Sequence, residues 1–99
     1  MAGWQTGLSD AIRQHVLDKY VSPARQQGSS SIILRSGDIH KQLALSNRLP
    51  QVCSAIDARR FEIEANVRLV DRQGPPVSPG VVWRYELLPI EDEVYDLVH

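Results

Sequence analysis

The 99-residue chain has little cysteine, few aromatic residues and no long apolar run, and each shortage excludes a class of protein. Its single cysteine, Cys53, rules out an internal disulfide and a cysteine-based zinc cluster. No apolar run approaches the roughly 18 residues that a membrane-spanning helix requires. The first residues, MAGWQTG, lack the basic start and apolar centre of a signal peptide, so we expect a cytoplasmic protein with no membrane partner.

Sequence motifs for catalysis and cofactor binding are also missing. The chain has no glycine-rich phosphate loop, no paired-carboxylate motif and no His-x-x-x-His metal spacing. Asp38 and His40 lie two residues apart on a predicted helix, so they point in different directions and make a poor catalytic pair. Cys53 lies on a predicted apolar stripe, which is typical of a small buried hydrophobe. We therefore expect no enzyme activity, no cofactor and no metal site.

Charge is distributed unevenly along the chain. The formal net charge is −1, but residues 91–99, EDEVYDLVH, hold four acidic groups and no lysine or arginine. Residues 1–90 carry eleven basic and eight acidic groups, a net charge of +3. We therefore divide the chain into one domain, 1–90, and an acidic C-terminal tail, 91–99. A mildly basic domain permits contact with DNA, and the tail either aids solubility or meets a protein partner.

The N-terminal third predicts one amphipathic helix followed by a short strand. Ser9 is a plausible N-cap, Pro23 marks the end of the helix or a kink, and Gly28 stops any further turn. The β-prone run after it covers residues 32–35. The predicted core face of this helix holds Leu8, Ile12, Val16, Leu17, Tyr20 and Val21.

Residues 36–61 predict two short helices broken by a polar turn. Ser36 would cap the first helix, in which Ile39 and Leu43 share one face. The turn contains Ser46 and Asn47, either of which can accept a hydrogen bond from the next helix. The second helix covers residues 48–59, and its outer face is small and polar. Its apolar stripe holds Leu49, Val52, Cys53 and Ile56.

The remaining residues predict a β-hairpin. Val67 and Leu69 alternate with a polar residue, and residues 81–87 alternate in the same way. Between these strands, residues 73–80 contain three prolines and two glycines, which neither a helix nor a sheet interior tolerates. Trp83 and Tyr85 then bring large apolar area to the core.

This order of helix, strand, two helices, strand, loop and strand resembles the winged helix-turn-helix superfamily over about residues 8–88. The closing strand, VVWRYELL, is similar to the last wing strand of that family. The turn before Pro50 is longer than usual, and Ala44 stands where glycine is common. The residues that match the supporting helix and the recognition helix are Ile39, Leu43, Leu45, Ser46, Val52 and Ile56.

The resemblance implies an α+β winged helix that binds double-stranded DNA. Helix 48–59 would enter the major groove, and wing 72–80 would touch the flanking backbone. Arg48 and Gln51 have the side chains that read guanine and adenine. The serine and asparagine side chains would donate to phosphates, the other helix-region cations would add charge contacts, and Arg72 and Gln73 would meet the backbone or the minor groove. The full predicted DNA-binding set is Arg35, Lys41, Ser46, Asn47, Arg48, Gln51, Ser54, Arg59, Arg72 and Gln73.

Three functions follow from the sequence. A small transcriptional regulator is the first, and it would act as a homodimer because one module buries little DNA surface. Its dimer surfaces would be the first helix and the apolar residues Val94, Tyr95, Leu97 and Val98 of the tail. The second is a winged-helix subunit that binds proteins in a larger assembly, which the near-neutral charge favours. The third is a mobile-element protein that inhibits a host factor.

Overall fold

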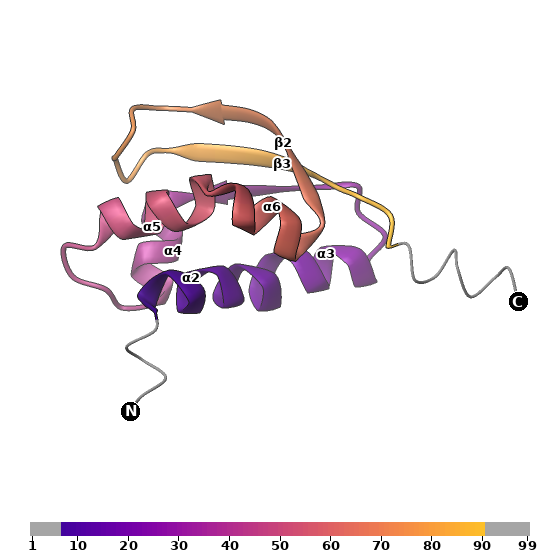
Figure 1. Cartoon of the computed structure of the whole chain (residues 1–99), viewed down its shortest axis with the longest axis horizontal. Coiled ribbons are helices and arrows are strands. Elements are labelled where there is room, and N and C mark those ends of the chain that lie inside the picture. The colour runs from indigo at the N-terminus through magenta and orange to yellow at the C-terminus, as the bar shows by residue number, and fades with distance from the viewer. Residues whose placement is uncertain (1–6, 91–99) are drawn as a thin grey trace, which may run out of the picture.

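A computed structural model describes residues 7–90. In this part of the chain, helices pack against one face of a three-stranded antiparallel sheet (Figure 1). The strand order is β1-β3-β2, so the last strand in the sequence lies in the centre. This α+β layout is compatible with a winged-helix-like arrangement. In chain order the elements are α2 (Leu8–Val16), η1 (Leu17–Val21), α3 (Ser22–Gln26), β1 (Ser31–Arg35), α4 (Ser36–Gln42), α5 (Leu49–Asp57), α6 (Arg59–Ala65), β2 (Val67–Gln73) and β3 (Val82–Leu87).

The first helix runs unbroken from α2 through the π-helical turn η1 into α3. The N–H of Ser22 donates to Leu17 O, five residues back, so the turn before Pro23 is wider than an α-helical turn. That extra width accommodates the proline ring, which would clash with the preceding turn of a regular α-helix. Gly28, at φ 77°, follows the end of α3, as predicted. Ser9 is not the cap, because the helix begins at Leu8.

The predicted helix 48–59 is wrong at its C-terminal end. Helix α5 stops at Asp57, Ala58 is extended at ψ 138°, and a separate helix, α6, follows. A continuous helix would have carried Arg60 on the apolar stripe, one turn after Ile56. The break leaves Arg60 exposed and turns Phe61 into the core instead. The observed order therefore has one helix more than the predicted α+β winged-helix order.

The core lies between the sheet and the helices, where α5 and α6 are sandwiched between the hairpin and the first helix (Figure 1). Trp83, Tyr85 and Phe61 are its largest buried side chains, and the Phe61 and Tyr85 rings meet edge to face at 5.1 Å. Burial of this aromatic area, together with the aliphatic core, stabilises the domain.

A β-bulge changes the direction of side chains in β2. Leu69 pairs with Tyr85 and Asp71 pairs with Arg84, so Val70 has no partner in the register. Before the bulge, Val67 and Leu69 face the helices. After it the alternation shifts by one residue, and Arg72, opposite the buried Trp83, points inward.

The described chain ends at Ile90, at the opposite end of the sheet from the hairpin loop (Figure 1). The predicted acidic tail 91–99, with the predicted dimer residues 94–98, lies outside the described residues. No helix among residues 7–90 is long and apolar enough to cross a lipid bilayer.

Candidate nucleic-acid interface

One face of helix α5 is buried in the protein, and a narrow opposite face, the open face, is exposed to solvent. Val52, Cys53 and Ile56 are almost fully buried, and the helix packs on α2. Opposite them, Pro50 and Ser54 are exposed. Because the open face carries short side chains, a partner can approach the backbone of this helix closely.

The turn before α5 holds Arg48 at the start of the helix. The Arg48 N–H donates to His40 Nε2 at 3.1 Å, which requires an unprotonated Nε2 and fixes the backbone of Arg48. Ala44 and Asn47 have φ values of 54° and 56°, so the chain reverses through two left-handed residues. Ala44 thus adopts a left-handed conformation that glycine adopts more readily. The Arg48 side chain is exposed.

Gln51 and Ser54 differ in accessibility, although both lie off the apolar stripe. Gln51 is half-buried, and its Nε2 donates to Ser9 Oγ at 3.3 Å across the α2–α5 contact. Ser54 is exposed, and no side-chain partner for it occurs within residues 7–90. The open face therefore offers Arg48, Pro50 and Ser54 to a partner, while Gln51 would first have to leave Ser9.

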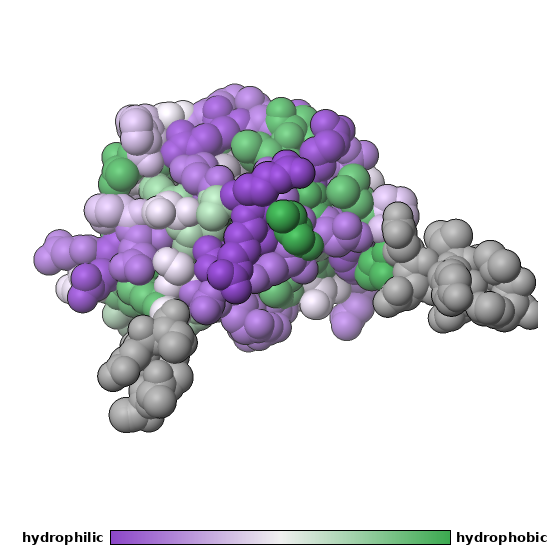
Figure 2. Space-filling model, in the orientation of Figure 1, coloured by the Kyte–Doolittle hydropathy of each residue, from purple (hydrophilic) through white to green (hydrophobic). Residues whose placement is uncertain are grey.

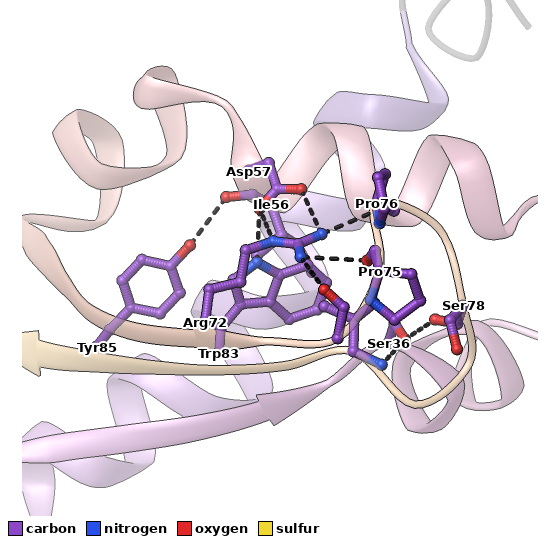
Figure 3. A network of polar contacts seen from close by, with 11 residues as sticks. Ser36, Ile56, Asp57, Arg72, Pro75, Pro76, Ser78, Trp83 and Tyr85 are labelled. Carbon is purple, nitrogen blue, oxygen red and sulfur yellow. Dashed lines mark hydrogen bonds and ion pairs between the residues drawn. The ribbon is translucent and has the colours of Figure 1, made fainter.

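An ion pair joins the end of α5 to the base of the hairpin loop (Figure 3). Arg72 Nε lies 2.8 Å from Asp57 Oδ1, and Arg72 NH2 lies 3.0 Å from Asp57 Oδ2, a bidentate geometry. Trp83 Nε1 donates to the same Asp57 Oδ1 at 2.7 Å. The guanidinium carbon also lies 5.6 Å from the centre of the Trp83 ring. We call Asp57, Arg72 and Trp83 the wing clamp.

The same guanidinium also binds the loop main chain. Arg72 NH1 donates to Gly74 O at 3.0 Å and to Pro75 O at 3.2 Å, while NH2 donates to Pro76 O at 3.1 Å. An arginine has five N–H donors, and here each has an acceptor inside the protein. Hydrogen bonding to Asp57 raises the pKa of Arg72 above its ordinary value.

A second attachment holds the other arm of the loop. Ser36 Oγ donates to Ser78 O and accepts from the Val81 N–H at 3.2 Å (Figure 3). The Gly37 N–H donates to Pro79 O at 2.9 Å. A Cβ on Gly37 would lie only 2.7 Å from that oxygen, so the loop can approach α4 only where a glycine stands. Both arms of the loop are therefore fixed to helices.

Tyr85 adds a buried hydrogen bond beside the wing clamp. Its hydroxyl donates to Ile56 O at 2.9 Å, one residue before Asp57 (Figure 3). Burial raises the pKa of Tyr85 above its ordinary value, and the neighbouring charge of Asp57 raises it further.

The structure separates the predicted DNA-binding residues into groups. Arg59 lies on α6, where it lines a groove of about 380 Å³ with Ile63 and Arg68. Arg72 is held in the wing clamp, and the Nε2 of Gln73 donates to Asp71 Oδ2 at 3.0 Å. The side chains that remain exposed near α4 and the turn are Arg35, Lys41, Ser46, Asn47 and Arg48.

Sequence reasoning missed Asp57, His40 and the two serines of the second attachment. Asp57 had a signal, because a carboxylate at the C-terminal end of a helix is unfavourable unless a cation compensates it. Ser36 was expected to cap α4, but no side-chain cap bond forms there and its hydroxyl binds the loop. His40 had no comparable signal, since its role depends on how the turn folds back.

No known protein family, curated protein or solved structure matches this chain. Within residues 7–90, no group of three or more histidine, cysteine or acidic side chains is arranged to hold a metal ion. Any assignment of function therefore depends on the site geometry.

Proposed function

We propose that this chain is a winged-helix protein that binds double-stranded DNA with sequence preference and acts as a small transcriptional regulator. Helix α5 would enter the major groove, and the loop between β2 and β3 would serve as the wing on the flanking strand. The support is an open helix face of short side chains beside a loop that is fixed at both arms.

Arg48 carries this proposal. It lies at the start of α5, its main chain is fixed by His40, and its side chain is exposed with no acidic partner among residues 7–90. An arginine in that position can bind a guanine edge with two hydrogen bonds or neutralise a phosphate. Because the backbone is already ordered, the conformational entropy lost on binding is mainly that of the exposed Arg48 side chain.

Two cations that precede Arg48 also lack a carboxylate partner among the described residues, as do Lys19, Arg59 and Arg84 elsewhere in the fold. Arg13, Arg60 and Arg68 form ion pairs with carboxylates of the described chain. Arg35 and Lys41, at the two ends of the α4 segment, are exposed and form no such pair within residues 7–90. The cations available to a polyanion therefore include both ends of α4 and the start of α5.

Tight specific binding would require two copies. A single domain of this size contacts too little DNA, so we propose a two-fold homodimer that reads two half-sites. The exposed side of the first helix is the surface of the described chain that we assign to this contact.

A salt-titrated binding assay on the full chain tests the proposal. Binding to a labelled duplex should weaken log-linearly with salt between about 50 and 200 mM. Arg48→Gln should weaken the binding. If Arg48 meets a phosphate, the slope of log affinity against log salt should also become less steep by about 0.9. If Arg48 instead reads guanine, the variant should lose roughly 1–3 kcal/mol of discrimination between duplexes.

The matched control is Arg84→Gln. Arg84 is exposed on β3, on the outer face of the sheet, and its loss changes the net charge by the same amount. We expect this variant to bind like the wild type. Equal losses in the two variants, or wild-type binding that ignores salt, would contradict the proposal.

Protein binding is the second candidate, and one surface favours it. Ile63 is 67% exposed on α6, beside Arg59 and Arg68. Figure 2 shows an apolar spot surrounded by hydrophilic residues over this helix. The groove beside Ile63 could hold a segment of a protein partner. If Ile63→Ser abolishes a biological activity that Arg48→Gln leaves intact, the chain acts as a protein-interaction subunit.

A further inference from the structure

The hairpin loop contains no group that can neutralise a phosphate. Residues 74–80 hold glycine, proline, valine and serine only, so the loop has no formal charge. The cation nearest to it along the chain, Arg72, has all five donors engaged by Asp57 and by three loop carbonyls. A phosphate could bind this guanidinium only after the clamp had opened.

From this arrangement we infer that the wing makes an uncharged contact with DNA, and that Arg72 is a positioning residue that does not touch the nucleic acid. This inference depends on the proposed function and specifies how one part of the site works. The surface available for contact is the exposed tip, Pro75, Pro76 and Val77. Its apolar rings and methyl groups can pack against the sugar edge of a groove.

The wing clamp is well suited to a positioning role. Asp57 is the last residue of α5, so the ion pair ties the wing directly to the helix that would enter the groove. The second attachment, from Ser36 to Ser78, ties the other arm to α4. A loop ordered before binding loses less conformational entropy when it docks, and this raises its affinity without any new contact.

Asp57→Asn distinguishes a positioning role of Asp57 from a purely electrostatic effect, because the two predict opposite changes in the affinity for DNA. The substitution removes a negative charge close to the interface, and that change alone should strengthen binding to a polyanion. If Asp57 positions the wing, binding should weaken about threefold to tenfold instead, because a loosened loop must be ordered on docking. The slope of affinity against salt should stay at the wild-type value, because no phosphate contact is gained or lost.

Two further variants of the full chain complete the experiment. Glu86→Gln removes the same charge from the outer face of the sheet, away from α5 and from the first helix, and should leave affinity at or slightly above the wild-type level. Arg72→Gln should weaken binding with an unchanged salt slope, whereas Arg48→Gln changes the slope if Arg48 meets a phosphate. Near-ultraviolet circular dichroism of each variant, at the assay temperature, checks that the fold around Trp83 persists.

The outcomes separate this inference from the proposed function. If Asp57→Asn binds more tightly with a steeper slope, the released Arg72 reaches a phosphate and the inference is wrong, while DNA binding stands. If the slope of log affinity against log salt is less steep by about 0.9 in Arg72→Gln, Arg72 contacts a phosphate and the inference is again wrong. If the wild type shows no salt-dependent binding, the proposed function fails, and the inference fails with it.

Discussion

Two arginines hold opposite ends of the β2–β3 hairpin, and they do so with different chemistry. At the loop end, the Arg72 guanidinium donates to the Asp57 carboxylate and to three loop carbonyls. The indole N–H of Trp83 donates to the same carboxylate. Arg25 holds the far end through carbonyls alone: NH1 donates to Leu88 O at 2.8 Å, and NH2 donates to Ala65 O and Asn66 O at 3.1 and 2.9 Å.

The attachment by Arg25 does not depend on a charged partner, whereas the attachment by Arg72 does. Arg25 neutralises the negative end of the α6 dipole, and its carbonyl acceptors do not titrate. The wing clamp depends on the charge of Asp57, and Arg72 and Asp57 have side chains 22% and 36% exposed, so dissolved salt can screen the ion pair. The end of the sheet next to the proposed interface is therefore the one that solution conditions can change.

Trp83→Ala should have the largest effect, because it removes the buried ring that supports the wing clamp. We expect a loss of about 3–5 kcal/mol in the free energy of unfolding, since a core cavity forms as well. Urea unfolding followed by far-ultraviolet circular dichroism measures this loss. Trp83→Phe keeps most of the apolar volume and loses the bond to Asp57, so it should lose much less. Equal losses would show that the indole N–H matters more than the packing.

Arg25→Ala should have the next largest effect, because it leaves three carbonyls at the far end without their donor. We expect a loss of about 2 kcal/mol, which should change little with salt, because the acceptors are neutral carbonyls and the hydrogen bonds are partly buried. Urea midpoints at several salt concentrations measure it. Arg25→Lys is the control that keeps the charge but lacks the planar fork. A loss that shrinks in high salt would contradict the proposed difference between the two ends.

Tyr85→Phe should have the smallest effect: about 1 kcal/mol is lost at neutral pH with the hydrogen bond to Ile56 O, and the difference from the wild type changes only at alkaline pH. Because the pKa of Tyr85 is raised on folding, the folded protein holds the phenolic proton more tightly than the unfolded chain. The resulting stabilisation is complete below the ordinary tyrosine pKa of about 10 and is lost as the pH rises above it.

The urea midpoint of the wild type should therefore fall more steeply above about pH 10 than that of the Tyr85→Phe variant. Both proteins share the other titrating groups, so the difference isolates this hydroxyl. Parallel decreases would mean that the tyrosine proton is equally easy to remove in both states.

Most of the elements could be predicted from local patterns. The spacing of Ile12, Val16 and Val21, and the alternation of Val81, Trp83 and Tyr85, indicated the buried faces that the structure has. The exact position of the break at Ala58 could not be predicted, because alanine favours a helix on its own. Arg60 gave a local signal: on the apolar stripe of a continuous helix, it indicates either that the helix frays near there or that its stem packs while its head reaches solvent. In the structure the break leaves Arg60 exposed and buries Phe61.

The candidate site was only partly predictable. Arg48 lies at the exposed start of a helix, as its position beside Pro50 suggested. Arg72 was expected at an exposed tip, and strict alternation from Val67 would indeed place it on the outer face. The bulge at Val70 shifts that alternation, and no residue near it is a glycine that would have signalled a bulge.

By itself the sequence determined which residues are apolar and at what period, and hence the helices, the strands and the proline-rich loop between two of them. Only the tertiary structure decided which cations face solvent. The side of the sheet on which Arg72 lies depends on a one-residue shift in strand pairing, and its partner Asp57 comes from a different element. Hydrophobic periodicity is a local property, whereas the pairing of charges depends on where distant segments meet.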